Sequence, residues 1–308
     1  MAERYQNYVN GAWVDATSGE VSTSTNPADL SDVVGEFQLS TSSDVDVAIT
    51  AAHFVKESWR RTSSLARGGY LLKAASYLEA NLEEYAQAIT RESGKAILES
   101  RGEVGRAVAL LQYFGVEGSN PVGSVVPSVN PNILLYTNRM PLGVVCLITP
   151  WNFPLAIPIW KMAPALVYGN TIVLKPASAT PHVATLIARM WEAVDLPDGV
   201  FNLVTGSGAA VGDELVTNSK VAAISFTGST RIGMSIAAQA AQRGKRYQLE
   251  MGGKNPVIVL PDADLEQAAE ITVSGAMKYS GQKCTATSRA IVVGNIMEEF
   301  TNLVVEKT

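Results

Sequence analysis

The alternation of short apolar strands and helices between residues 143 and 253 is the feature that most constrains the fold. Continuous apolar segments such as TIVL and GVVCLI are typical of strands that are covered on both faces of a sheet. Five strands separated by helices predict an α/β fold with an open parallel sheet and right-handed crossovers. The expected strands cover residues 143–150, 171–176, 200–206, 221–228 and 246–253.

The segments on either side of this region have different patterns. Residues 1–42 are rich in Thr, Ser and Asn and predict short strands and loops, with a small hairpin over residues 5–14. Apolar residues at three- and four-residue spacing predict helices over residues 43–118. Residues 122–143 read as two extended pieces around a Pro/Asn turn, as in an arm that leaves the domain body. After residue 253, the order strand, helix, strand, helix begins a second α/β unit.

The composition argues against several classes of protein. The 308 residues carry a net charge of −5 without a long basic run, so we expect neither nucleic acid nor an anionic membrane as a partner. No apolar run approaches the roughly 20 residues that span a bilayer, and no signal peptide is visible at the N-terminus. Two cysteines imply no disulfide framework, so we expect a reducing, cytoplasmic location. His53 and His182 lack ligands at metal-binding spacing, so we expect no metal site and interpret both as solvated or packed.

Unusual residues gather where the expected strands end. Ligands of open parallel sheets bind beyond the carboxyl ends of the strands. We therefore predict a ligand site at this edge of the sheet. The residues at these ends are Pro150, Trp151, Asn152, Lys175, Pro176, Thr205, Gly206, Thr227, Gly228, Ser229 and Glu250.

The stretch 280-SGQKCTATSRA-290 contains a candidate nucleophile. Cys284 lies in a Gly-containing turn beside Lys283, whose positive charge would favour a thiolate. Cys146 lies among Val and Leu within an expected strand, so we interpret it as a small core hydrophobe. The local sequence alone leaves Cys284 open to two interpretations, a nucleophile or a buried core thiol.

Two polar residues in unusual surroundings are candidates for further catalytic roles. Glu250 stands at a strand end before two glycines, either as a solvated loop residue or as a base in a cleft. Asn152 lies between Trp151 and Phe153, where it either pins the turn or donates to an oxyanion. The stretch 227-TGSTRIG-233 opens a helix with only a degenerate version of the dinucleotide-binding glycine fingerprint, although such a helix start can still hold a phosphate.

Together these pieces resemble the aldehyde dehydrogenase superfamily. The matching motifs occur in order over most of the chain. They are 149-TPWNFPL-155, 174-LKPAS-178, 226-FTGSTRIG-233, 249-LEMGGKNP-256 and 281-GQKCTA-286. The Lys-Cys-Thr setting of the cysteine looks most like bacterial semialdehyde dehydrogenases, including the α-ketoglutarate semialdehyde type.

The resemblance implies a role for each matching residue. Cys284 corresponds to the nucleophile that forms a thiohemiacetal and then a thioester, and its backbone N–H to a second oxyanion donor. Glu250 corresponds to the base that activates the deacylating water, and Asn152 to the oxyanion donor. These are a soft nucleophile, a carboxylate base and a neutral donor, which suit acyl chemistry at neutral pH.

The resemblance also implies a nicotinamide cofactor, NADP or NAD. Lys175 would bind the adenosine ribose, and Gly228 and Ser229 would lie beside the pyrophosphate. The position three residues after the lysine carries glutamate in many NAD-specific members, but here it is Ser178. The loss of that carboxylate predicts that NADP is accepted, either as the preferred cofactor or with dual specificity. The full expected cofactor set is Thr149, Pro150, Trp151, Lys175, Ser178, Gly208, Phe226, Gly228, Ser229 and Gly252.

The substrate is expected to be a small aldehyde. Trp151, Phe153 and Trp160 either wall an apolar tunnel or belong to the core. Arg106, on a helix that by resemblance borders the entrance, either holds the carboxylate of a semialdehyde or is a solvated helix arginine. Lys283 is a further candidate substrate contact.

The chain is short for the family that it resembles. We expect a Rossmann-like cofactor domain over residues 1–121 and 142–252, an oligomerisation arm over 122–141, and an incomplete catalytic domain over 253–308. Members of the family are homo-oligomers, dimers or tetramers. The shortness leaves a second interpretation open, a truncated remnant that binds nucleotide without catalysis. A third, a cofactor-free cysteine hydrolase, is disfavoured because no histidine base lies near the cysteine.

Overall fold

The computed structural model describes residues 2–120 and 122–308, which form two compact units. The larger unit contains Met1–Thr227 and Gly233–Leu249, and the smaller contains Gly228–Ile232 and Glu250–Thr308. The chain therefore passes between the units at residues 227/228, 232/233 and 249/250.

The larger unit is built on a seven-stranded sheet with the order β12-β11-β8-β9-β10-β2-β3. The pairs β8–β9, β9–β10 and β8–β11 are parallel, which confirms the predicted α/β fold with a parallel sheet. The chain leaves β8 toward β9 and later returns to its other side with β11, so the strand order reverses at β8. The strands are β2 (Asn7–Val9), β3 (Ala12–Val14), β8 (Val144–Ile148), β9 (Thr171–Lys175), β10 (Phe201–Leu203), β11 (Val221–Gly228) and β12 (Arg246–Met251).

The predicted hairpin near the N-terminus forms and has an unexpected place in the sheet. Asn10 and Gly11 both have positive φ, 52° and 77°, as a tight two-residue hairpin turn requires. Strand β2 pairs antiparallel with β10, so the sheet is mixed at this edge. Strand β10 is shorter than predicted because the backbone N–H of Thr205 turns to the side chain of Asn7, with a nitrogen–oxygen distance of 2.9 Å.

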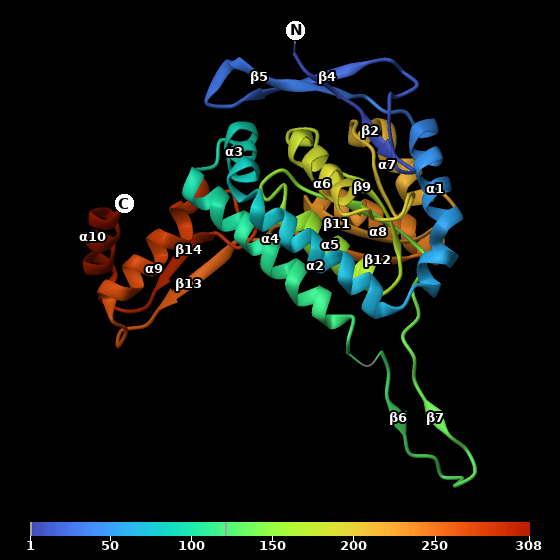
Figure 1. Cartoon of the computed structure of the whole chain (residues 1–308). Helices are drawn as coiled ribbons and strands as arrows, with labels where there is room; N and C mark the ends of the chain where they lie inside the picture. The colour runs from blue at the N-terminus through green and yellow to red at the C-terminus, as the bar shows by residue number, and fades with distance from the viewer. Residues whose placement is uncertain (1, 121) are drawn as a thin grey trace. The chain divides into compact units, whose positions relative to one another are not determined.

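Helices cover both faces of the central sheet (Figure 1). Helices α1 and α7 pack against each other, and α1 lies on β8, β9 and β10. Helix α5 packs on β8 and β9 and α6 packs on β10, with α2 and α4 outside them. This double cover explains why every residue of β9 is buried. The helices are α1 (Ser42–Arg61), α2 (Ser64–Ala80), α3 (Leu82–Ser93), α4 (Ile97–Glu117), α5 (Ala156–Val167), α6 (Pro181–Ala193), α7 (Gly208–Thr217) and α8 (Thr230–Gln242).

Two further strand pairings belong to the larger unit. Strands β1 (Arg4–Tyr5), β5 (Asp29–Gln38) and β4 (Val21–Asn26) form a small sheet that contacts α3 and α6. The predicted arm consists of β6 (Val125–Val126) and β7 (Leu135–Tyr136), an antiparallel pair whose residues are all exposed. It projects from the larger unit as a hairpin (Figure 1).

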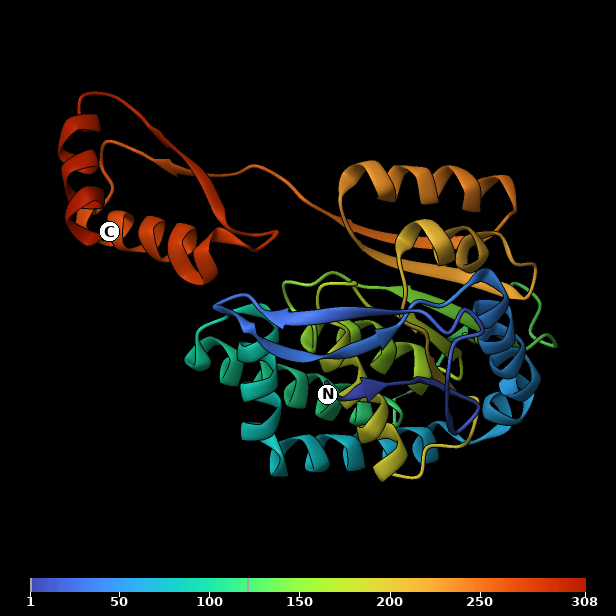
Figure 2. The same ribbon diagram turned by 90° about the horizontal axis from the view of Figure 1, so that it is seen from above.

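The smaller unit has the predicted order strand, helix, strand, helix. Strands β13 (Asn255–Val259) and β14 (Thr287–Val292) pair in parallel. Helices α9 (Leu265–Met277) and α10 (Met297–Lys307) pack on each other beside them (Figure 2). Their small shared core contains Val259, Ala269 and Phe300.

Within the part of the chain that the structure describes, no helix combines the length and apolar character needed to cross a bilayer. The same residues contain no cluster of three or more His, Cys, Asp or Glu side chains suited to hold a metal ion.

Candidate active site

The loop that carries Asn152 begins where β8 ends. Ile148 lies opposite Lys175 in the parallel register of β8 and β9, and the backbone N–H of Thr149 donates to the Lys175 carbonyl at 3.2 Å. The loop therefore leaves the sheet at the carboxyl edge where ligands of such sheets bind. Asn152 itself is half-buried, and α5 starts four residues after it.

A buried ion pair lies beneath this loop. Lys95 and Glu103 contact each other through Nζ and Oε2, and their side chains are 1% and 0% exposed. Lys95 Nζ also donates to the Asn152 carbonyl at 2.9 Å and lies 4.0 Å from the centre of the Phe153 ring. The sequence interpretation missed both charges. One signal was available, since Glu103 occupies an apolar position in the helical pattern EVGRAVALL.

Lys175 is a buried ammonium at the end of β9. Its side chain donates to the Pro176 carbonyl at 2.9 Å, and the residue is only 6% exposed. Burial lowers the pKa of Lys175 from 10.5 to about 8. Among the described residues no carboxylate pairs with it, so this cation is available to an anionic or hydroxyl-bearing ligand.

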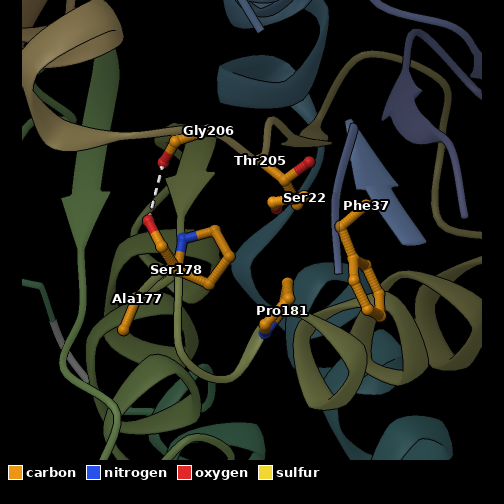
Figure 3. Close-up of a pocket in the computed structure, with 8 residues that line it drawn as sticks. Ser22, Phe37, Ala177, Ser178, Pro181, Thr205 and Gly206 are labelled. Carbon is orange, nitrogen blue, oxygen red and sulfur yellow. Dashed lines mark hydrogen bonds between the residues drawn. The ribbon is translucent and has the colours of Figure 1, made fainter. Parts of the chain in front are cut away.

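Ser178 lies three residues further on, at the surface, and its hydroxyl donates to the Gly206 carbonyl at 3.1 Å (Figure 3). Both residues line a small cavity of about 10 Å³. The space is about that of a single water centre. The cavity is lined by Ser22, Phe37, Pro176, Ala177, Ser178, Pro181, Thr205 and Gly206.

The remaining expected cofactor residues of the larger unit differ in accessibility. Pro150 is half-buried and Gly208 is exposed at the start of α7, which is capped by the Ser207 hydroxyl. Thr149 is buried, and its hydroxyl has no hydrogen-bond partner among the described residues. Phe226 is only 4% exposed, so its ring belongs to the core and can meet a ligand only through its backbone.

Cys284 is the exposed one of the two thiols, and Cys146 is fully buried in β8. The interpretation of Cys146 as a core hydrophobe is consistent with burial, which raises the pKa of its thiol to about 12. The alternative that Cys284 is a buried core thiol is wrong. Its carbonyl accepts from the Asn255 side-chain amide at 2.7 Å, and the same amide donates to the Ala286 carbonyl at 3.0 Å.

The turn that leads to Cys284 is conformationally unusual. Tyr279, Ser280 and Gly281 have φ of 54°, 52° and 70°, three successive residues in the left-handed region. Such a conformation costs roughly 1–2 kcal/mol for each non-glycine residue and concentrates at functional sites. The sequence predicted a glycine turn here, but nothing in it indicated left-handed Tyr279 and Ser280.

The other candidates of the smaller unit are also accessible. Glu250 is exposed and begins the second segment of this unit within β12, and Gly252 is also exposed. Neither Gly252 nor Gly253 has positive φ. Ser229 is exposed and precedes α8, with its hydroxyl 3.5 Å from the backbone nitrogen of Ile232. Gly228 and Lys283 are half-buried.

The aromatic substrate candidates do not lie in the core. Trp151 and Trp160 are 42% and 50% exposed, so the core interpretation is wrong for both. Phe153 is half-buried beneath Lys95, as described above. The guanidinium of Arg106, on α4, stacks on the Trp160 ring at 4.9 Å from its centre. Arg106 is exposed on α4, and this cation–π contact favours one position of its guanidinium.

The larger unit thus brings together Asn152, Lys175 and Ser178 at one edge of its sheet, and the smaller unit carries Cys284 and Glu250. The family model for the aldehyde dehydrogenase family matches residues 13–308. The chain belongs to the aldehyde dehydrogenase family. The predicted family membership is confirmed.

Named relatives of this aldehyde dehydrogenase family chain include semialdehyde dehydrogenases. It is 51% identical over 304 residues to the alpha-ketoglutaric semialdehyde dehydrogenase of Bacillus subtilis, covering 99% of this chain and 62% of the relative. It is 37% identical over 297 residues to the NADP(+) succinate-semialdehyde dehydrogenase of Escherichia coli, covering 96% of this chain and 61% of the relative. The chain thus spans about 62% of the length of the Bacillus relative.

Solved structures agree with the fold. The structure of 3,6-anhydro-L-galactose dehydrogenase in complex with NAP matches with a TM-score of 0.95 at 36% identity, covering 99% of this chain and 64% of that one. Betaine aldehyde dehydrogenase from Staphylococcus aureus, in complex with NAD+, matches with a TM-score of 0.95 at 32% identity, covering 98% and 60%.

Proposed function

We propose that the protein oxidises an aldehyde, and specifically a semialdehyde with a terminal carboxylate, to the acid with NADP or NAD. The family membership and the semialdehyde dehydrogenases among the relatives support this reaction. The observation that carries the proposal is the contrast between the two thiols: Cys284 is exposed and follows a turn with three left-handed residues, and Cys146 is buried.

The proposed roles follow from the chemistry of each side chain. The Cys284 sulfur attacks the aldehyde carbon, and the resulting oxyanion receives hydrogen bonds from the Asn152 amide and the Cys284 backbone N–H. After the carbon has lost hydride, a thioester remains on the sulfur. Glu250 then takes a proton from water as the water attacks the thioester, and the acid and the thiol are released.

A bound nicotinamide cofactor would supply the hydride acceptor. The residues of the larger unit fit such a group, because Lys175 presents a buried ammonium without a carboxylate partner among the described residues. Ser178 adds a neutral hydroxyl where a carboxylate would repel a 2′-phosphate. We propose that NADP is accepted for this reason, with Gly228 and Ser229 beside the pyrophosphate.

Three further proposals accompany this function. Arg106, held by Trp160, binds the carboxylate of the substrate. The hairpin over residues 122–141 serves oligomerisation, which its exposed apolar side chains support. A reducing, cytoplasmic compartment suits an enzyme whose two cysteines are free thiols.

The test is formation of NADPH or NADH by the full chain with α-ketoglutarate semialdehyde. Cys284→Ala is expected to abolish the activity, and Cys146→Ala is the matched control that is expected to retain it. Iodoacetamide labelling gives a second readout, since Cys284 is expected to react first and to be protected by substrate. Turnover that persists in Cys284→Ala would refute the proposal.

The same experiment distinguishes the two alternative functions. Cofactor binding without turnover in a folded chain would identify a nucleotide-binding remnant. Ester hydrolysis that depends on Cys284 but needs no nicotinamide would identify a cysteine hydrolase.

A further inference from the structure

The buried Lys95–Glu103 pair has no obvious value for stability. Both side chains are removed from water, at 1% and 0% exposure. The desolvation of two charges often exceeds their mutual attraction, so an apolar pair of similar size would be equally stable or more stable. The pair therefore calls for an explanation in terms of the groups that it contacts.

The contacts of the pair converge on the loop that carries Asn152. Lys95 Nζ donates to the Asn152 carbonyl at 2.9 Å and covers the next ring, Phe153. Glu103 Oε1 accepts the backbone N–H groups of Leu155 at 2.9 Å and of Ala156 at 3.0 Å. Lys95 lies just before α4 and Glu103 lies within it. The first turns of one helix therefore hold both Asn152 and the end of the loop at Leu155 and Ala156.

Glu103 also replaces a missing cap. The residue before α5, Leu155, has no side-chain oxygen to accept the first N–H groups of the helix. The carboxylate accepts two of them, and its negative charge is favourable at a helix N-terminus. On the other side, the Thr149 N–H is fixed to the Lys175 carbonyl of β9. The loop is thus held at its start, its middle and its end.

We propose that Lys95 and Glu103 are positioning residues for Asn152, which set the peptide plane at Asn152 and thereby the direction of its side-chain amide. The inference rests on the proposed function, in which that amide donates to the oxyanion. Hydrogen bonds to ionised groups are shorter and stronger than those between neutral groups, which suits a device for geometry. A donor aimed at developing charge is effective only when its position is fixed in advance.

The decisive variant is Lys95→Met/Glu103→Gln. It removes both charges, so no unpaired charge is left in the core, and the introduced amide oxygen can still accept the two N–H groups that begin α5. The double variant has no side-chain donor at position 95 for the Asn152 carbonyl. Lys95→Met alone leaves Glu103 buried and without its cation and is expected to lose stability, and the double variant is expected to recover it.

Catalysis should separate from stability in these variants. With the best semialdehyde, the double variant is expected to fold like the parent and to lose roughly 10- to 100-fold in kcat, as misplacement by about 1 Å can cause. Its KM is expected to remain within about twofold of the parent, because the loss concerns the transition state. Amide hydrogen exchange over residues 151–157 is expected to become faster. The matched control is Arg101→Met, which breaks the exposed pair between Arg101 of α4 and Glu83 of α3 and should change neither kcat nor exchange.

A cycle with Asn152→Ala separates the inference from the proposed function. If Lys95 acts through Asn152, the double variant should lose little further activity in the Asn152→Ala background. A folded double variant with parental kcat would overturn the inference. So would a double variant that lowers kcat in the Asn152→Ala background by as much as it does in the parent. If Asn152→Ala itself keeps parental kcat while Cys284→Ala is inactive, the positioning inference falls and the cysteine mechanism stands.

Discussion

Lys175 should make the binding of a 2′-phosphate depend on pH in a way that the structure specifies. Its ammonium is 6% exposed, and burial lowers its pKa from 10.5 to about 8. The charged form attracts a phosphate and donates to ribose hydroxyls, and the neutral form provides no charge. Binding above pH 8 must therefore be accompanied by proton uptake.

The magnitude follows from this pKa. The dissociation constant for adenosine 2′-monophosphate should rise by only about twofold between pH 7 and 8, because Lys175 is mostly charged at pH 7 and half charged at pH 8. The phosphate, with its second pKa near 6, is mostly a dianion over this range. Above pH 8 the constant should rise about tenfold per pH unit, until the pKa of Lys175 in the complex is reached. Adenosine 5′-monophosphate should show a weaker dependence if its phosphate lies farther from Lys175.

The folded protein alone gives an independent readout. Holding an ammonium at a site where its pKa is about 8 costs about 3 kcal/mol at pH 7 relative to the unfolded chain. Between pH 8 and 10.5 the unfolded state binds more protons than the folded state, so stability from this residue should rise with pH. Lys175→Met is expected to be more stable than the parent at pH 7, and this advantage should vanish above pH 10.5.

Calorimetric titration at several pH values and urea unfolding at pH 7 and 10 would measure both effects. Lys73→Met, at an exposed lysine on α2, is the matched control and should alter neither. A dissociation constant without a break between pH 7 and 10, together with unchanged stability of Lys175→Met, would refute the reasoning.

Five further substitutions have expected outcomes. Ser178→Glu should lower the ratio of kcat/KM for NADP to that for NAD by roughly tenfold or more through repulsion of the 2′-phosphate, and an unchanged ratio would reject this role. Arg106→Ala should raise KM for acidic but not for neutral aldehydes, and equal effects on both would reject carboxylate binding. Gly68→Ala should lower the free energy of unfolding in urea by about 2 kcal/mol, because its new Cβ would clash with a carbonyl of α4. Gly69→Ala, where nothing lies within 4 Å of the new Cβ, should raise it by about 0.5 kcal/mol. Burial raises the pKa of the Glu92 carboxyl to about 8, so the free energy of unfolding should fall by up to about 5 kcal/mol as pH rises from about 5 through 8. Glu92→Gln should remove this pH dependence, and a variant with the parental pH dependence would contradict the role of Glu92.

The sequence predicted the central sheet well because its signals are local. Strands such as β9 are continuous apolar runs, and each is followed by a helix at short range. The pairing of β2 with β10 was not predicted, because Tyr8 and Leu203 are far apart in the chain and no local pattern links them. The turn of Asn10 and Gly11, by contrast, was readable from two adjacent residues.

The site was predictable where its residues end strands or interrupt a pattern. Cys284 and Asn152 stand out from their neighbours, and the family motifs supplied their expected roles. Lys95 and Glu103 were missed because a charged residue in a helical stretch is ordinarily solvated. Only the packed structure shows that both lie in the core beneath the loop of Asn152.

The two units support their reactive side chains by the same physical means. In the larger unit, Lys95 fixes the backbone carbonyl of Asn152. In the smaller, the Asn255 amide fixes the carbonyls of Cys284 and Ala286. In each case the support acts on the main chain at the residue that carries the proposed catalytic group. Because a supporting residue of this kind touches no reacting atom, its loss should reduce kcat through geometry while substrate affinity is retained, which is the signature that separates support from binding.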